Sequence, residues 1–384
     1  MSFSHKYTVK VQVSTNHPLT MEGQGASDRM TYGNYLRLEE MLQLQEGPSG
    51  YDPAPSNDEK HFIIVHQAFE LWFKLVISEL KEVHKLMDSN NISEQSMPKI
   101  VHHLKRVTEV FNLMSHQWKV METLTPQDFL SFRDRLGTSS GFESWQLRQI
   151  EIILGLEQQQ RDAGMDPLNH MKRLESAGKI SSSVVNEFEA MINSPSLNEL
   201  LTNWLSRTPI NGSLPRQSND EQVVSDYINS HLIAMNEHSK MVISHFTSIG
   251  HGNESTLGDR LQKSIQNAKN FLIPEGEINR SRAGLLFIES YRNLPLLAWP
   301  RTLIDSFVEA EESILLFRNS HARMVERMIG RRMGTGGSSG VDYLDATLKY
   351  RIFVDLWTVR TILLKRELLP EVVNSEYYGF NSQS

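Results

Sequence analysis

The chain of 384 residues contains no cysteine. It therefore cannot form disulfides, and thiolates cannot bind zinc, an iron–sulfur cluster or haem iron in it. No apolar run approaches the roughly 20 residues that cross a bilayer. The N-terminal segment also lacks the apolar core that is typical of a secretory signal. These absences predict a cytoplasmic protein that does not insert into a membrane.

An excess of basic charge is missing as well. The chain has 39 Lys and Arg residues against 46 Asp and Glu residues, which gives a formal net charge of −7. This balance argues against a general nucleic-acid-binding protein. Hydrophobic residues make up 39% of the chain and charged residues 22%, so the sequence can form a substantial core.

Strand signals are scarce, and the alternation in Thr8–Ser14 is the main candidate for a short strand. Long stretches instead carry apolar residues three and four positions apart, which predicts an all-α fold. We expect an N-terminal arm over residues 1–30, one large helical domain over 31–370 and a C-terminal tail over 371–384, of which 374–384 should be frayed. The expected long helices cover His61–Met87, Ser93–Met121, a segment from Pro126 that Thr125 caps, Glu143–Leu156, Glu221–Phe246, Arg282–Asn293, Arg301–Met333 and Tyr343–Glu367.

Two histidines lie on apolar helical stripes. His66 is in line with Phe62 and Phe69, and His321 shares a face with Phe317 and Met324. For either residue alone, a core histidine bonded to a carbonyl or a carboxylate is the commoner explanation. Together they allow one imidazole to bind a metal centre while the other faces its open side. A neutral imidazole in an apolar groove is what a proximal haem ligand requires.

Other metal sites fit the sequence less well. There is no His-Glu-x-x-His motif, and adjacent helical residues such as His102 and His103 point about 100° apart, so they do not chelate one ion easily. His231 and His238 lack the Glu-x-x-His context of a di-iron bundle.

Three further features allow two readings each. The glycine-rich segment 334–340 can form an anion-binding nest or a flexible linker. Arg133, one helical turn after Phe129, can clamp a carboxylate or form a surface salt bridge. Tyr32 and Tyr35 can share a helical face, which ordinary packing explains equally well.

Five segments, in order along the chain, resemble the tryptophan 2,3-dioxygenase family, whose members use haem to open the indole ring of L-tryptophan. The block His66-Gln67 to Lys74 and the block from His321 to Gly340 are the most specific. The middle, about 160–245, resembles the family only weakly. The similar segments are 32–36, 62–74, 129–133, 140–144 and 321–340.

The resemblance implies a haem-dependent dioxygenase that converts L-tryptophan and O2 to N-formyl-L-kynurenine. It implies one haem b per subunit, with His321 as the axial iron ligand and His66 on the distal side, near the indole N–H. Family members are mostly homotetramers, so a homotetramer is implied, with no nucleic-acid or membrane partner.

The resemblance also implies a set of pocket residues. Phe62, Phe129 and Leu136 would wall the indole pocket, and Arg133 would bind the substrate carboxylate. The remaining assignments are Thr335 at the substrate ammonium, Ser140 and Gly336 near the haem, and Tyr32 and Tyr35 reaching the pocket from a neighbouring subunit.

Two other functions are kept open. Arg135 and Phe69 stand where relatives often carry other residues, which leaves room for a related haem oxygenase that acts on a substituted tryptophan. A helical binding or scaffold protein without activity is the third possibility, although the sequence offers no exposed heptad seam or basic stripe for it.

Overall fold

The computed structural model describes residues 30–379, apart from 49, 90–91, 94, 138, 162–165, 251–252 and 333–339. Thr8–Ser14 lies outside these residues. The chain divides into two compact units, Met1–Pro55 and Ser56–Ser384. The described part of the first unit holds two short helices, α1 (Tyr32–Leu36) and α2 (Leu38–Met41).

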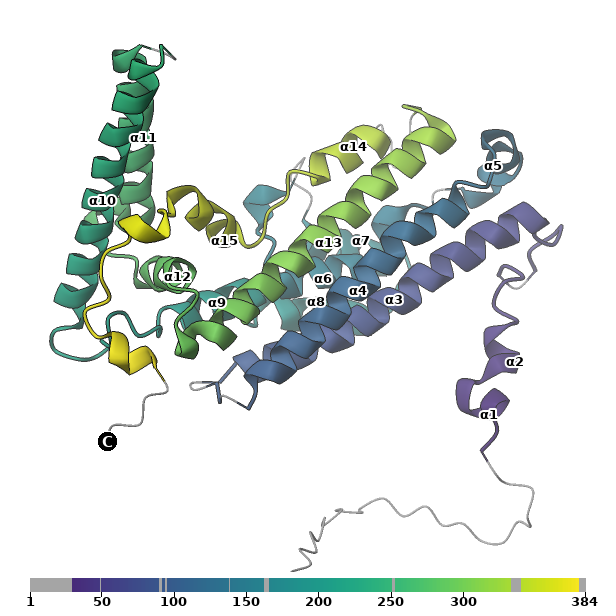
Figure 1. The fold of residues 1–384 in the computed structure, drawn as a ribbon. Coiled ribbons are helices and arrows are strands. Elements are labelled where there is room, and N and C mark those ends of the chain that lie inside the picture. Colours follow the sequence, from purple (N-terminus) through teal and green to yellow (C-terminus); the bar gives the residue numbers. More distant parts are fainter. Residues whose placement is uncertain are drawn as a thin grey trace, which may run out of the picture. The chain divides into compact units, whose positions relative to one another are not determined.

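Three long helices form the centre of the second unit (Figure 1): α3 (Asn57–Met87), α4 (Met97–Met121) and α13 (Ala298–Ile329). The α4 helix packs against both of the others. Each carries an apolar stripe whose residues are buried, and these stripes meet in one hydrophobic core. Because this packing fixes the three helices, it also fixes the positions of the side chains that project from them.

Shorter elements complete one end of the site. The helix α5 (Pro126–Arg133) begins at Thr125, whose side chain accepts a hydrogen bond from the amide of Asp128. It continues into the single turn η1 (Asp134–Leu136), and α6 (Trp145–Leu154) follows after Ser144, which caps it in the same way. The remaining helices are α7 (Pro167–Ser176), α8 (Ser182–Ile192), α9 (Leu197–Leu205), α10 (Asp220–Ser248), α11 (Glu254–Leu272), α12 (Arg280–Ser290), α14 (Gly340–Thr347) and α15 (Val354–Thr358).

The expected all-α class is confirmed. Within the described residues, the only β-type pairing is an isolated bridge between Ile210 and Ser213. No helix among these residues is long and apolar enough to span a membrane. The predicted boundaries at residues 30 and 370 stay a prediction.

Two sequence-based expectations are wrong. The segment Tyr343–Glu367 is not one helix, because α14 ends at Thr347 and α15 starts at Val354. Between them, the amide of Phe353 donates to the buried carboxylate of Glu311 at 3.3 Å, as does the amide before it, so this backbone bonds to α13 rather than to its own helix.

The second concerns the tail, which is not frayed as far as Tyr378. That side chain is 1% exposed, and its hydroxyl donates to the carbonyl of Pro209 at 2.9 Å and accepts from the amide of Gly212 at 3.0 Å. A buried aromatic ring with a satisfied hydroxyl anchors this part of the chain.

Candidate active site

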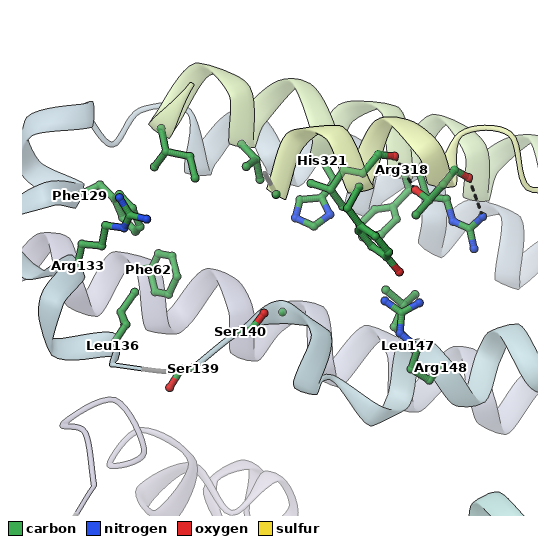
Figure 2. Close-up of a pocket in the computed structure, with 18 of the residues that line it drawn as sticks. Phe62, Phe129, Arg133, Leu136, Ser139, Ser140, Leu147, Arg148, Arg318 and His321 are labelled. Atoms are coloured by element: carbon green, nitrogen blue, oxygen red, sulfur yellow. Dashed lines mark hydrogen bonds between the residues drawn. The ribbon is translucent and has the colours of Figure 1, made fainter. Parts of the chain in front are cut away.

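A cavity lies between α3, α5, α6, α13 and α14 and has about 1140 Å³ of space between its walls, its open mouth included. Figure 2 shows Phe62, Phe129 and Arg133 gathered at one end, while His321 projects into the cavity from the side opposite Ser140 and Leu147. The lining residues are Phe62, Phe129, Arg133, Leu136, Ser139, Ser140, Gly141, Leu147, Arg148, Glu151, Phe317, Arg318, His321, Val325, Ile329, Gly340, Tyr343, Leu344 and Thr347.

His321 faces this cavity with an uncharged ring. Its imidazole stacks on the indole of Trp118, with centroids 4.5 Å apart and ring planes 1° from parallel. Burial, together with His66 and Arg148 nearby, lowers the pKa of His321 to about 3. At neutral pH the ring is therefore neutral and one of its nitrogens carries a lone pair, which is the state that binds a metal ion.

His66 lies beside the cavity rather than on its wall. Its Nδ1 donates to the carbonyl of Phe62 at 2.8 Å, one turn back on α3, and its ring lies 4.1 Å from the ring of Phe62. Phe62 is one of the residues that line the cavity, whereas His66 is not. Because Nδ1 holds the proton, Nε2 is left as an acceptor, and burial lowers the pKa of His66 so that the ring stays neutral.

The structure brings most of the other expected pocket residues together. Phe62 and Phe129 lie with ring centroids 5.7 Å apart, and Arg133, Leu136 and Ser140 join them on the cavity wall. They come from three separate elements, α3, α5 with η1, and the segment before α6, so only the folded chain assembles them.

The described residues do not allow the remaining expected residues to be assigned to this site. Tyr32 and Tyr35 belong to the first unit, where their side chains are 74% and 73% exposed. Thr335 and Gly336 fall outside the described residues.

A buried ionic cluster, which the sequence reasoning missed, forms another part of the wall. Arg148, Glu151 and Arg318 all line the cavity and are at most 7% exposed. Glu151 accepts from Arg148 at 2.9 Å, from Arg318 at 2.9 Å and from Arg161 at 2.6 Å. Three guanidinium groups share one carboxylate, so the cluster keeps an excess of positive charge beside the cavity.

A sequence signal for this cluster exists. Arg148 and Glu151 are three residues apart in an otherwise apolar helical segment, and Arg318 stands three residues before His321 on a buried helix. Charged residues at core positions are rarely buried without a partner or a ligand.

Because of this cluster, we expect the free energy of unfolding to depend on pH in the acid range. Burial raises the pKa of Glu151, but the three arginines outweigh burial and lower the pKa from 4.5 to about 2. A carboxyl whose pKa is lower in the folded state stabilises the fold above pH 4.5, and this contribution disappears as the pH falls toward 2. We expect Glu151→Gln to lose on the order of 3 kcal/mol of unfolding free energy at neutral pH, and less as the pH falls.

Denaturant unfolding at a series of pH values measures this difference. The control is Glu82→Gln, whose carboxylate is 51% exposed and lies 4.0 Å from Lys85, so its effect should be small at every pH. A Glu151→Gln deficit that stays constant between pH 5 and pH 2 would contradict the proposed ionisation of the cluster.

The fold and the cavity define an all-α protein with a largely apolar open cavity, in which one neutral histidine faces the ligand space and one arginine stands beside aromatic side chains. Comparison with known proteins specifies the family. The family model described as "Tryptophan 2,3-dioxygenase" matches residues 19–363.

Named relatives agree with this match. The chain is 42% identical to a tryptophan 2,3-dioxygenase of Sorangium cellulosum, covering 91% of this chain and 87% of that protein. It is 40% identical to tryptophan 2,3-dioxygenase 2 of Ralstonia nicotianae, covering 92% and 99%, and 31% identical to the Anopheles gambiae enzyme, covering 93% and 91%. The chain belongs to the tryptophan 2,3-dioxygenase family.

Proposed function

We propose that this protein is a haem-dependent dioxygenase that adds both atoms of O2 across the indole C2=C3 bond of L-tryptophan and yields N-formyl-L-kynurenine. Family membership supports the reaction. The observation that carries the proposal is the placement of a neutral His321 and of Arg133 on one aromatic-lined cavity. The first can bind iron and the second can bind the carboxylate of an amino acid.

The residues of the cavity fit a haem. His321 would hold the iron through its unprotonated nitrogen, and Val325, Ile329 and Leu344 offer apolar surface for a macrocycle. The excess positive charge at Arg148 and Arg318 suits the carboxylates of that group. Ser140 lines the same cavity, and Gly336 belongs to the glycine-rich segment that we expect near it. When bound, ferrous haem supplies the activation of O2.

The chain's own residues bind and orient the substrate. Phe62, Phe129 and Leu136 form an apolar slot against which the indole would pack, and Arg133 stands beside them as the partner of the carboxylate. Thr335 is our assignment for the ammonium end. Fixing the amino acid at two ends holds the indole double bond in one orientation and excludes water, which is chiefly a positioning contribution.

His66 serves the indole N–H in this proposal. Its Nε2 is the acceptor, because Nδ1 donates to the Phe62 carbonyl. An indole N–H is a very weak acid, so hydrogen bonding and orientation are the role that we assign, rather than full proton removal. Because Phe62 lines the cavity and His66 does not, this role requires a local rearrangement of α3 side chains when the substrate binds.

We also propose a homotetramer in which the arm of one subunit completes the pocket of another. The exposed rings of Tyr32 and Tyr35, 74% and 73%, support this idea, since large aromatic side chains are seldom left uncovered in pairs. A cytoplasmic location stays a prediction.

The experiment is aerobic incubation of haem-loaded protein with L-tryptophan and a reductant. The proposal expects the absorbance of N-formyl-L-kynurenine and a product heavier by two oxygen atoms. The alternative, a haem oxygenase for a substituted tryptophan, expects a higher kcat/KM for a ring-substituted tryptophan or a gain of one oxygen atom. Protein that binds both haem and tryptophan without forming the product would refute the assigned reaction.

A further inference from the structure

An ion pair joins the two walls of the indole slot. Arg135 Nη1 lies 2.7 Å from Oε2 of Glu59. The Glu59 side chain is 2% exposed, and that of Arg135 is 26% exposed. A carboxylate buried to this degree requires a cationic partner, because it loses its hydration.

Both partners are next to residues of the cavity. Glu59 is in the first turn of α3, three residues before Phe62, so the two side chains share a face of that helix. Arg135 is in η1, two residues after Arg133 and directly before Leu136. The pair therefore ties the helix that carries one side of the slot to the turn that carries the other side.

The turn needs such an attachment. The helix α5 ends at Arg133, and η1 is a single turn that stops at Gly137, whose φ of 55° reverses the chain. The amide of Gly137 makes a long bond of 3.3 Å to the carbonyl of Asp134. A single turn takes part of its orientation from contacts with the rest of the protein, and the bond to Glu59 is one such contact.

We propose that Glu59 and Arg135 are positioning residues for substrate binding: their ion pair sets the separation between Phe62 and the Arg133–Leu136 segment. The proposal rests on the proposed function of the cavity. Neither residue touches the substrate, and each acts through its neighbours on the wall. Without the ion pair the turn can move. Arg133 and the aromatic side chains then no longer bind the two ends of one substrate molecule at the same time.

The test uses the haem-loaded holoprotein and the variants Glu59→Gln, Arg135→Met, their combination and Arg135→Lys. We expect KM for L-tryptophan to rise between about 10- and 100-fold in Glu59→Gln and Arg135→Met, with kcat lowered far less. The double variant should lose less than the sum of the two single variants, because the two side chains share one ion pair. Arg135→Lys keeps the charge and should recover part of the affinity.

A second ion pair provides the control. Arg280 Nε lies 2.8 Å from Oδ2 of Asp220, and this pair joins α12 to α10 without lining the cavity. Asp220→Asn should lower thermal stability but leave KM unchanged. Additive single effects, an unchanged KM in Arg135→Met, or an equal rise of KM in Asp220→Asn would overturn the inference.

The outcomes for the two proposals differ. If the wild-type protein binds haem but never oxygenates tryptophan, the proposed function fails. If the wild-type protein is active and the Arg135 variants match it in KM, only the positioning inference fails. If Glu59→Gln does not fold, Arg135→Met and Arg135→Lys still test the positioning inference, because the Arg135 side chain is partly exposed.

Discussion

His321→Ala is expected to yield a protein that is folded but colourless and inactive. The imidazole would hold the haem iron in our account, and the chain has no cysteine to replace it. Loss of even an outer partner of a metal ligand typically lowers affinity 10- to 100-fold, so loss of the ligand itself should lower haem affinity by more than roughly 100-fold. The Soret absorbance of the purified protein and turnover of L-tryptophan measure the effect.

A matched control keeps this test specific. His116 is exposed on α4, and its Nδ1 bonds to the carbonyl of Asn112 at 2.9 Å, so His116→Ala should keep both absorbance and activity. Added imidazole should restore part of the Soret band of His321→Ala by occupying the vacated space. A His321→Ala protein with normal haem content and normal turnover would contradict the ligand assignment.

Arg133→Met is expected to abolish tight binding of L-tryptophan while the protein still takes up haem. Truncating one partner of a buried charged hydrogen bond costs about 2–5 kcal/mol, which is on the order of 30- to 4000-fold in affinity. The increase in Kd, followed by the shift of the Soret band on adding L-tryptophan, measures the loss.

Indole has no carboxylate, so its binding tests the aromatic slot without the contact to Arg133. Wild type and Arg133→Met should bind indole equally well. Arg327→Met is the control variant, since the Arg327 side chain is 69% exposed and lies outside the cavity wall. Equal loss of tryptophan and indole binding in Arg133→Met would show that the substitution disturbs the aromatic slot rather than a carboxylate contact.

The sequence predicted the parts of the site that depend on helical periodicity. The spacing of Phe62 and His321 along apolar stripes placed each on the inner face of a long helix, and in the structure both are half-buried and line the cavity. Residues of one helix face have a fixed geometry, so pattern alone suffices. Which helices face one another was supplied by the family resemblance, not by the pattern.

Contacts between segments that are far apart in the sequence could not be predicted from helical periodicity. Glu151 and Arg318 in the buried cluster are 167 positions apart, and Glu311 accepts from an amide at the start of α15, more than forty residues further along the chain. The bond from His66 back to Phe62 was a local possibility, yet the choice between it and a cavity-facing ring depends on the packing around α3.

The fate of the oxygen atoms tests the central claim most directly. Haem-loaded protein is given L-tryptophan under labelled O2 in ordinary water, and the product is analysed by mass spectrometry at once. Two labelled atoms in N-formyl-L-kynurenine are the predicted result. A product that carries one labelled atom, or none, would contradict a dioxygenase that acts in this cavity.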